Sequence, residues 1–255
     1  MIHAVIFDLD GTLVKTERLK AISYAEAARS LVPTVKKHDV IEAFKDVVGL
    51  SRQEVATALM AKFHLEEAAR QQMARFGVDA PWQAYVAIRL RVYDSLIADP
   101  DVLCENRWPY TIETVEISRR HHCMTGLATM SVRAQALKVL EVLDLRQAFD
   151  FVATRDDVVD GKPDPEIYNL VARHLGVGSS ECLVIEDSPT GVKAALNAKM
   201  QVIAVSTPFT RMHLHEGDLL PANRIIDHHQ LLPPLVESML EETAPSPKRV
   251  HRLRM

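Results

Sequence analysis

The sequence lacks the features that mark several large classes of protein. Its 255 residues carry 30 Lys and Arg against 34 Asp and Glu, a formal net charge of −4, so no basic excess is available to hold nucleic acid or an anionic membrane. The three cysteines, Cys104, Cys123 and Cys182, form no C-x-x-C pair, which argues against a disulfide framework or a zinc cluster. Any anionic ligand must therefore be held locally, and a reducing cytoplasm is the expected location.

Long hydrophobic runs are absent as well. No stretch approaches the ~20 apolar residues needed to span a bilayer. The apolar N-terminus reaches Asp8 too soon to form the core of a signal peptide. The chain nevertheless has 47% hydrophobic and 25% charged residues, a composition typical of a globular protein with a substantial core. We expect a soluble protein that is not exported, built as one large domain or two smaller ones.

Short β-prone runs alternate with helical segments through much of the chain. Strands, each followed by a polar loop, are predicted at 4–7, 124–129, 149–153, 182–185 and 202–205. Helices are predicted between them at 133–144, 165–175 and 190–198. This alternation predicts an α/β domain with a central parallel sheet.

Residues 15–100 follow a different pattern, because they are helical almost throughout and contain no convincing strand. We interpret them as a helical domain inserted between the first and second strands. Residues 1–14 and 101–255 then form the α/β core. After Glu241 the chain contains prolines and a basic terminus, where a solvated end is favoured over a nucleic-acid-binding tail.

Polar segments follow the predicted strands, and loops that leave the carboxyl ends of parallel strands open at one edge of the sheet. Asp8 and Asp10 stand one residue apart directly after a buried strand, a concentration of negative charge that a divalent cation would explain. One such aspartate can both ligate Mg²⁺ and attack phosphorus. Gly11 lets the backbone turn sharply after the second carboxylate.

Three further segments add hydroxyl, ammonium and carboxylate groups. Thr129 follows the second strand, and its hydroxyl can donate to a phosphoryl oxygen, although a helix cap is the commoner use. Lys162 lies in the rigid G-K-P-D-P turn at 161–165 and can neutralise a nucleophile and a phosphate. After another buried strand, Asp187 is predicted to bind the metal, and Glu186 either assists it or holds Lys162.

Together these segments resemble the four motifs of the haloacid dehalogenase superfamily. In chain order they read FDLDGTL at 7–13, T-x-S-x-R at 129–133, GKPDPEIY at 161–168 and VIEDSPTGVKAAL at 184–196. The lysine and threonine phrases are common singly, but the D-x-D-G-T and E-D-S-x-x-G pair in this order is highly specific. The resemblance implies a Rossmann-like three-layer α/β core and a Mg²⁺-dependent phosphatase.

The resemblance also implies a role for each matched residue. Asp8 matches the nucleophile that forms an aspartyl-phosphate, and Asp10 matches the general acid/base. Thr129 and Lys162 match the residues that hold the phosphoryl group. The implied metal ligands are Asp8, Asp10 through its backbone carbonyl, Glu186 and Asp187.

The helical insertion resembles the small cap of the branch that contains β-phosphoglucomutase and phosphoglycolate phosphatase, where the cap closes over the site and contacts the leaving group. Gly49, Ser51 and Arg52 match a G-x-S-R substrate loop, and Thr16 matches a residue beside the cap hinge. These four are the cap's candidate substrate-binding residues. A helix N-cap at Ser51 with a solvated Arg52 is the alternative interpretation.

Departures from the mutase pattern bear on the reaction. Lys20 stands where the mutase has a histidine, and Val48 stands where it has a lysine. Hydrolysis of a small phosphomonoester, above all a sugar phosphate, is therefore favoured. The open alternatives are a β-phosphoglucomutase-like phosphotransferase and a binding protein on an inactive enzyme fold. We expect a small phosphorylated metabolite as partner, no nucleic acid or membrane, and a monomer or weak homodimer.

Overall fold

Buried apolar runs form the central sheet. The structure, a computed structural model, describes residues 1–48 and 50–242. Six parallel strands lie in the order β3-β2-β1-β4-β5-β6. Their bounds are β1 Ala4–Phe7, β2 Met124–Ala128, β3 Phe151–Ala153, β4 Cys182–Glu186, β5 Gln201–Val205 and β6 Ile225–Ile226.

The register of the central strand brings the polar segments together. β1 pairs in parallel with β2 on one side and β4 on the other, and Phe7 lies opposite Leu127 and Ile185. Because the three strands run in the same direction, the loops that follow them emerge side by side at one edge of the sheet. All four residues of β1 are fully buried, as expected for a strand covered on both faces.

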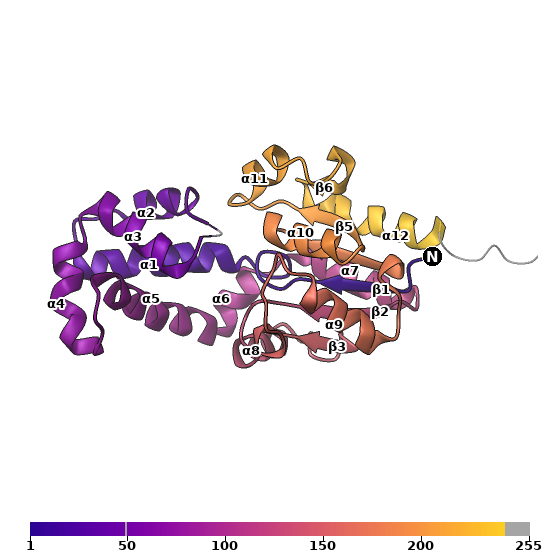
Figure 1. Ribbon diagram of the computed structural model, residues 1–255, viewed down its shortest axis with the longest axis horizontal. Helices are drawn as coiled ribbons and strands as arrows, with labels where there is room; N and C mark the ends of the chain where they lie inside the picture. The colour runs from indigo at the N-terminus through magenta and orange to yellow at the C-terminus, as the bar shows by residue number, and fades with distance from the viewer. Residues whose placement is uncertain (49, 243–255) are drawn as a thin grey trace, which may run out of the picture.

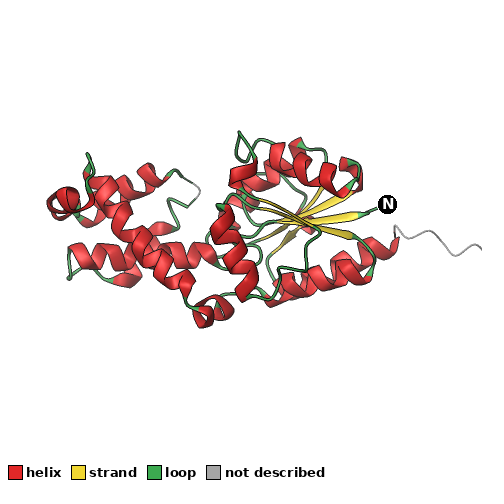
Figure 2. Cartoon of the chain, turned by 90° about the horizontal axis from the view of Figure 1, so that it is seen from below, coloured by secondary structure: helices red, strands yellow, loops and turns green. Residues whose placement is uncertain are grey.

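Helices cover both faces of the sheet. Their bounds are α7 Pro109–Arg120, α8 Arg133–Val142, α9 Glu166–Leu175, α10 Pro189–Asn197, α11 Arg211–Glu216 and α12 Leu232–Glu242. Val5 and Phe7 of β1 share an apolar cluster with α7, α8 and α12, whereas Ala4 and Ile6 share one with α9, α10 and α11. The sheet, seen between its helices in Figure 2, is the middle of three layers. The predicted Rossmann-like α/β fold is confirmed.

One strand lies where no prediction placed it. β6 contains only Ile225 and Ile226, and two residues are too few to show a hydrophobic period. Predicted boundaries also move: the strand expected at 149–153 begins at Phe151, and the one expected at 124–129 ends at Ala128. None of the described helices has the length and apolar character to cross a bilayer.

The second lobe is a helical cap (Figure 1). Its helices are α1 Thr16–Leu31, α2 Lys37–Phe44, α3 Arg52–Phe63, α4 Glu66–Phe76 and α5 Pro81–Ala98, and α6 Pro100–Glu105 leads back to the core. The cap has an apolar cluster of its own, in which the rings of Tyr24 and Tyr85 lie 5.6 Å apart and the Tyr85 hydroxyl donates to the Tyr24 carbonyl at 2.8 Å. Most members of this cluster lie in the cap helices.

Two linkers join the cap to the core and lie side by side. The Lys15 amide donates to the Asn106 carbonyl at 2.7 Å, and the Trp108 amide donates to the Leu13 carbonyl at 2.8 Å. The chain thus crosses between the lobes at 13–15 and at 106–108. The predicted boundary at 100–101 falls at the start of α6, on the cap side of the second crossing.

Candidate active site

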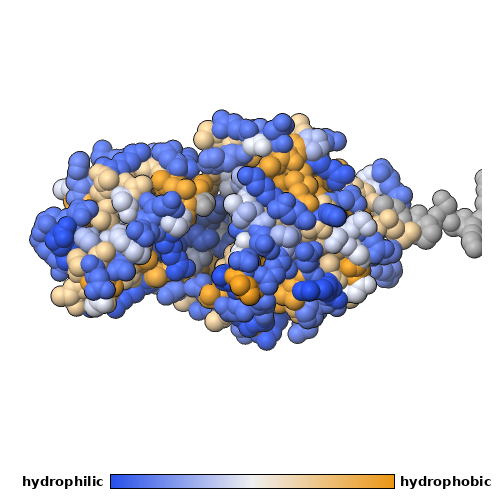
Figure 3. Space-filling view, viewed as in Figure 1, coloured by the Kyte–Doolittle hydropathy of each residue, from blue (hydrophilic) through white to orange (hydrophobic). Residues whose placement is uncertain are grey.

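A cavity of about 700 Å³ lies between the cap and the edge of the sheet where the polar loops emerge. Figure 3 shows the molecule hollowed between the two lobes. The core contributes Asp8, Asp10, Ser131, Lys162, Glu186 and Asp187 to its lining, and the cap contributes Glu17, Lys20, Tyr24, Phe44, Arg52 and Arg89. Asp8, Asp10, Lys162, Glu186 and Asp187 of the predicted motifs therefore share one cavity with side chains of the inserted helices, whereas Thr129 is fully buried beside it.

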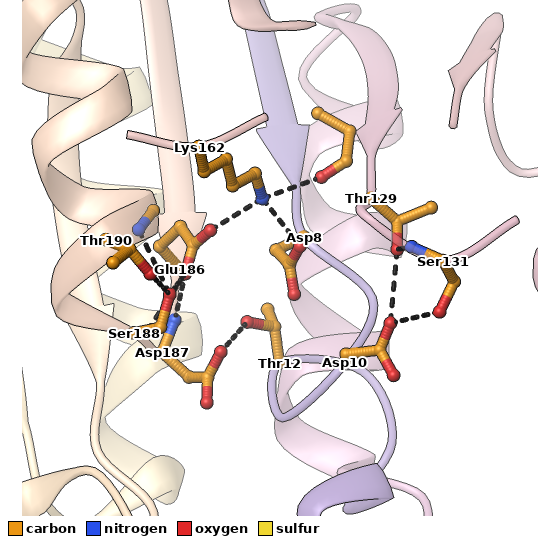
Figure 4. Close-up of polar contacts among 12 residues, drawn as sticks. Asp8, Asp10, Thr12, Thr129, Ser131, Lys162, Glu186, Asp187, Ser188 and Thr190 are labelled. Carbon is orange, nitrogen blue, oxygen red and sulfur yellow. Dashed lines mark hydrogen bonds and ion pairs between the residues drawn. The ribbon is translucent and has the colours of Figure 1, made fainter. Parts of the chain in front are cut away.

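Lys162 connects two of the acidic segments (Figure 4). Its Nζ lies 2.7 Å from Asp8 Oδ1 and 2.7 Å from Glu186 Oε1, and it donates to the Ala128 carbonyl at 2.9 Å. Burial alone would lower the pKa of this ammonium, but the Asp8 and Glu186 carboxylates outweigh burial and hold the pKa of Lys162 well above its ordinary value. The lysine is a fixed positive charge beside Asp8.

Glu186 is surrounded by hydrogen-bond donors. Its Oε1 accepts from Lys162 and, at 3.0 Å, from the Tyr168 hydroxyl. Its Oε2 accepts from the Asp187 amide at 2.8 Å, the Ser188 amide at 2.9 Å and the Ser188 hydroxyl at 3.1 Å. Burial by itself would raise the pKa of Glu186, but Lys162 and the other donors lower it below its ordinary value. Glu186 is a stable anion that holds Lys162 in place.

The remaining carboxylates have fewer donors. Carboxylate oxygens of Asp8, Glu186 and Asp187 lie within 4.8 Å of one another, and all three residues are buried. Asp187 Oδ1 accepts a long hydrogen bond of 3.5 Å from Thr12, and Asp187 Oδ2 has no partner in the described part of the chain. Burial, opposed by Lys162 and reinforced by Glu186, raises the pKa of Asp8 to about 7. Burial likewise raises the pKa of Asp187 well above its ordinary value.

This cluster fits a divalent cation. A buried carboxylate oxygen without a partner, beside other carboxylates, is costly unless a positive charge compensates it. Carboxylate and carbonyl oxygens are the ligands that Mg²⁺ prefers. Gly11 permits the close approach, because its φ is +90° and a Cβ there would overlap Asp187 Oδ2.

Asp10 points away from this cluster. Its Oδ2 accepts from the Ser131 hydroxyl at 2.5 Å and from the Thr129 hydroxyl at 3.2 Å (Figure 4). Its Oδ1 lies 3.3 Å from Lys20 Nζ of α1. Burial would raise the pKa of Asp10, but the Lys20 ammonium and the Ser131 hydroxyl outweigh burial and bring it to about 2. The cap thus reaches the core inside the site.

The four candidate residues of the cap occupy different positions. Ser51 is the N-cap of α3, because its hydroxyl accepts from the Glu54 amide at 3.3 Å while the Glu54 carboxylate accepts from the Ser51 amide at 2.9 Å. Arg52 lines the cavity. Ser51 is therefore a helix N-cap, as the alternative interpretation has it, and Arg52 is exposed at the rim of the cavity. A substrate contact of Arg52 stays a prediction. Thr16 is buried at the start of α1, and Gly49 lies outside the described residues.

Comparison with known proteins decides the family. A family model described as haloacid dehalogenase-like hydrolase matches residues 2–199. The chain belongs to the haloacid dehalogenase-like hydrolase family. The resemblance carried by the four motifs is confirmed.

Named relatives of this haloacid dehalogenase-like hydrolase include phosphatases. Phosphorylated carbohydrates phosphatase of Thermotoga maritima is 32% identical over 201 residues, covering 79% of this chain and 83% of the relative. Hexitol phosphatase B of Escherichia coli strain K12 is 29% identical over 210 residues, covering 81% and 85%. A solved structure of a putative β-phosphoglucomutase from Thermotoga maritima has a TM-score of 0.68 at 27% identity, covering 95% of this chain and 100% of that one. The prediction of a phosphatase of this family is confirmed.

Several residues of this hydrolase site carry no role in the sequence-based prediction. Tyr168 ends the GKPDPEIY phrase, and the first turn of α9 directs its hydroxyl to Glu186. Ser131 donates to Asp10 and lies within the T-x-S-x-R phrase, so the motif itself could have marked it as a site residue. Arg89 belongs to no motif, so only the packing of the cap places it at the cavity.

Lys162→Met is expected to destabilise the hydrolase and to stop turnover. It leaves Asp8 and Glu186 buried without their counter-charge, and losing one partner of a buried ion pair costs roughly 3–5 kcal/mol. Urea unfolding followed by circular dichroism measures the change. Lys138→Met, at an exposed position of α8, is the matched control. An equal unfolding midpoint for the two variants would contradict the role of Lys162.

Proposed function

We propose that this haloacid dehalogenase-like phosphatase hydrolyses a small phosphomonoester, and that its substrate is a sugar phosphate. The observation that carries the proposal is the meeting of Asp8, Lys162 and Asp187 at the floor of a cavity whose opposite wall, formed by the cap, contains Arg52 and Arg89. The named phosphatases of phosphorylated carbohydrates and hexitols support the substrate class. A cytoplasmic location and a monomer or weak homodimer stay predictions.

We assign Mg²⁺ to the carboxylates of Asp8 and Asp187 and the backbone carbonyl of Asp10. When bound, the ion supplies positive charge to the phosphoryl oxygens. Glu186 lies within the same cluster, but five donors already occupy its oxygens. Of the two roles predicted for Glu186, its contacts favour holding Lys162 over a direct place at the metal.

Asp8 is the nucleophile in this proposal. One of its carboxylate oxygens forms a bond to phosphorus while the bond from phosphorus to the leaving oxygen breaks, which gives an aspartyl-phosphate. Lys162, which stays protonated 2.7 Å from Asp8, neutralises charge that gathers on the phosphoryl group. Thr129 acts through Asp10, because its hydroxyl donates to Asp10 Oδ2 at 3.2 Å and orients that carboxylate.

Asp10 is the general acid and base in this proposal. It gives a proton to the leaving oxygen, then takes one from the water that attacks the aspartyl-phosphate, which releases phosphate and restores Asp8. Burial would raise the pKa of Asp10, but its contacts with Lys20 and Ser131 lower it, so donation of a proton requires that these contacts loosen.

The cap wall suits an electronegative leaving group. The guanidinium of Arg89 lies 5.1 Å from the ring centroid of Tyr24 and 4.7 Å from that of Tyr93. Arg89 is 5% exposed, its Nε has no hydrogen-bond partner in the described part of the chain, and no described carboxylate pairs with it. Such a buried cation favours hydroxyl or anionic groups of a substrate. Arg52 lines the same wall.

Arg52→Ala is expected to impair turnover of sugar phosphates selectively. Loss of a charge-assisted hydrogen bond of about 1.5–3 kcal/mol lowers kcat/KM roughly 10- to 100-fold. For p-nitrophenyl phosphate, whose leaving group offers the arginine no hydroxyl, kcat/KM stays within about threefold. Arg70→Ala, on the exposed face of α4, is the control. Equal losses on both substrates would rule out a specific contact.

Phosphate release across a panel of sugar phosphates and phosphoglycolate, with Mg²⁺ and with EDTA, tests the proposed function. We expect release that depends on Mg²⁺ and is fastest with one class of sugar phosphate. The putative β-phosphoglucomutase with a TM-score of 0.68 keeps a phosphotransferase as the second candidate. Isomer formation without phosphate release would favour that candidate, and no turnover of any ester would overturn both.

A further inference from the structure

A loop of the core reaches into the cap. Residues 206–210 connect β5 to α11, at the side of the core that faces the cap (Figure 1). The loop starts from a fixed base, because the Ser206 amide donates to the Ile226 carbonyl at 2.9 Å and a ring nitrogen of His229 lies 2.8 Å from the Ser206 carbonyl. Its tip carries Thr207 and Phe209, both buried.

Phe209 packs in the apolar cluster of the cap, although its backbone belongs to the core. Its ring centroid lies 6.0 Å from that of Phe44 in α2, with the planes at 77°. Phe44 in turn lies 5.6 Å from Tyr24 of α1, and both of these rings line the active-site cavity. The core loop therefore packs against rings of the cap wall without lining the cavity itself.

Thr207 makes the second contact. Its hydroxyl donates to Glu17 Oε2 of α1 at 2.9 Å, between two buried residues 190 positions apart in the chain. The same hydroxyl oxygen accepts from the amides of Phe209 and Thr210, each at 3.2 Å, so the loop itself fixes where the hydroxyl lies. Glu17 lines the cavity beside Lys20. A rigid donor on the core thus sets the position of a cap carboxylate.

These contacts restrict the rotation of the cap about its linkers. Near the hinge, Leu19, Tyr93 and Ile97 of the cap pack in the core's apolar cluster. A lobe anchored only at its hinge can still rotate about it, and small domains joined by two linkers move in this way. The contact of Phe209 with Phe44 in α2 adds a point of attachment away from the linkers, and the contact of Thr207 with Glu17 fixes the start of α1 close to the first crossing. One aromatic pair and one hydrogen bond are weak enough to open and admit a substrate.

We propose that Thr207 and Phe209 are positioning residues that dock the cap on the core and thereby hold the cap wall where it contacts the leaving group. The kinetic consequence rests on the proposed phosphatase function, whereas the docking does not. Thr207→Val keeps the shape of the side chain and removes the donor, Thr207→Ser keeps the donor, and Phe209→Ala removes the ring. Arg211→Ala is the control, because Arg211 follows the same loop and pairs with Asp227 of the core at 2.9 Å.

Hydrogen exchange of the substrate-free protein tests the docking without any assumption about function. In Thr207→Val and Phe209→Ala, amides in α1 and α2 are expected to exchange about tenfold faster, while β1 and β4 keep their rates. Thr207→Ser and Arg211→Ala keep the wild-type pattern. Unchanged exchange in α1 and α2, or an increase spread equally over the sheet, would overturn the proposal.

Kinetics test the consequence of docking. For the best sugar phosphate, the docking variants are expected to raise KM about tenfold, while kcat for p-nitrophenyl phosphate stays within about twofold. Thr207→Ser restores the wild-type KM. Parallel loss of kcat on both substrates would overturn the positioning role. If wild-type protein hydrolyses no ester, the proposed function fails, and the exchange experiment still decides the docking.

Discussion

Asp8→Asn is expected to abolish phosphate release, with a loss of at least about 10⁴-fold in kcat, as is typical when a catalytic nucleophile is removed. The amide has the shape of the carboxylate but cannot attack phosphorus. It also removes one of three buried carboxylates within 4.8 Å of one another, so the fold tolerates the change. Phosphate release and intact-protein mass spectrometry of the phosphorylated enzyme measure the two expected losses.

Asp160→Asn is the matched control for this experiment. Asp160 is exposed in the loop that leads to Lys162, so its change leaves the site intact. We expect full activity and an unchanged thermal unfolding midpoint from the control, and a folded protein from Asp8→Asn, because Lys162 keeps its ion pair with Glu186 there. Turnover by Asp8→Asn at the wild-type rate would refute the covalent mechanism. A binding protein on an inactive fold would show no turnover even in the wild type.

Mg²⁺ is expected to stabilise the protein strongly at pH 8 and weakly at pH 5. Burial raises the pKa of Asp8 to about 7 and that of Asp187 above its ordinary value, so the folded metal-free protein binds protons more tightly than the unfolded chain. The stability gained from this is fully present below the ordinary pKa near 3.8 and is lost as the pH rises through about 7. Above that pH the ionised cluster needs a cation.

The size of the effect follows from binding linkage. Mg²⁺ at about a hundred times its Kd contributes about 2.7 kcal/mol, roughly 5–10 °C in Tm for a chain of this size. Thermal unfolding with Mg²⁺ and with EDTA at both pH values measures it. Asp187→Asn should lose most of the shift. Asp10 and Glu186, whose pKa values are lowered, change stability mainly below pH 4, whereas burial also raises the pKa of Glu17 to about 7. Because Glu17 titrates with and without the metal, the difference between Mg²⁺ and EDTA at each pH is the quantity to compare. Equal shifts at pH 5 and pH 8 would contradict the assignment.

The pattern of strands and polar loops along the chain was enough to predict which charged residues lie close together. Asp8, Lys162 and Asp187 lie in loops of the α/β core, and two of them directly follow strands with buried apolar runs. Parallel strands bring their carboxyl ends to one edge whatever the details of packing, so strand order and loop chemistry suffice to predict a shared site. The sequence did not predict β6, because its two residues, Ile225 and Ile226, are too short a run to show a hydrophobic pattern.

Only the tertiary structure decided how the side chains divide their tasks. The Lys162 and Tyr168 donors to Glu186, the ion pair of Lys20 with Asp10, and the contact of Phe209 with Phe44 join residues of different elements. The physical reason is that hydrogen bonds and ring contacts depend on side-chain direction and on the placement of the cap over the sheet. The spacing of residues along the chain predicts neither of these. It does show the alternation of buried runs and polar loops.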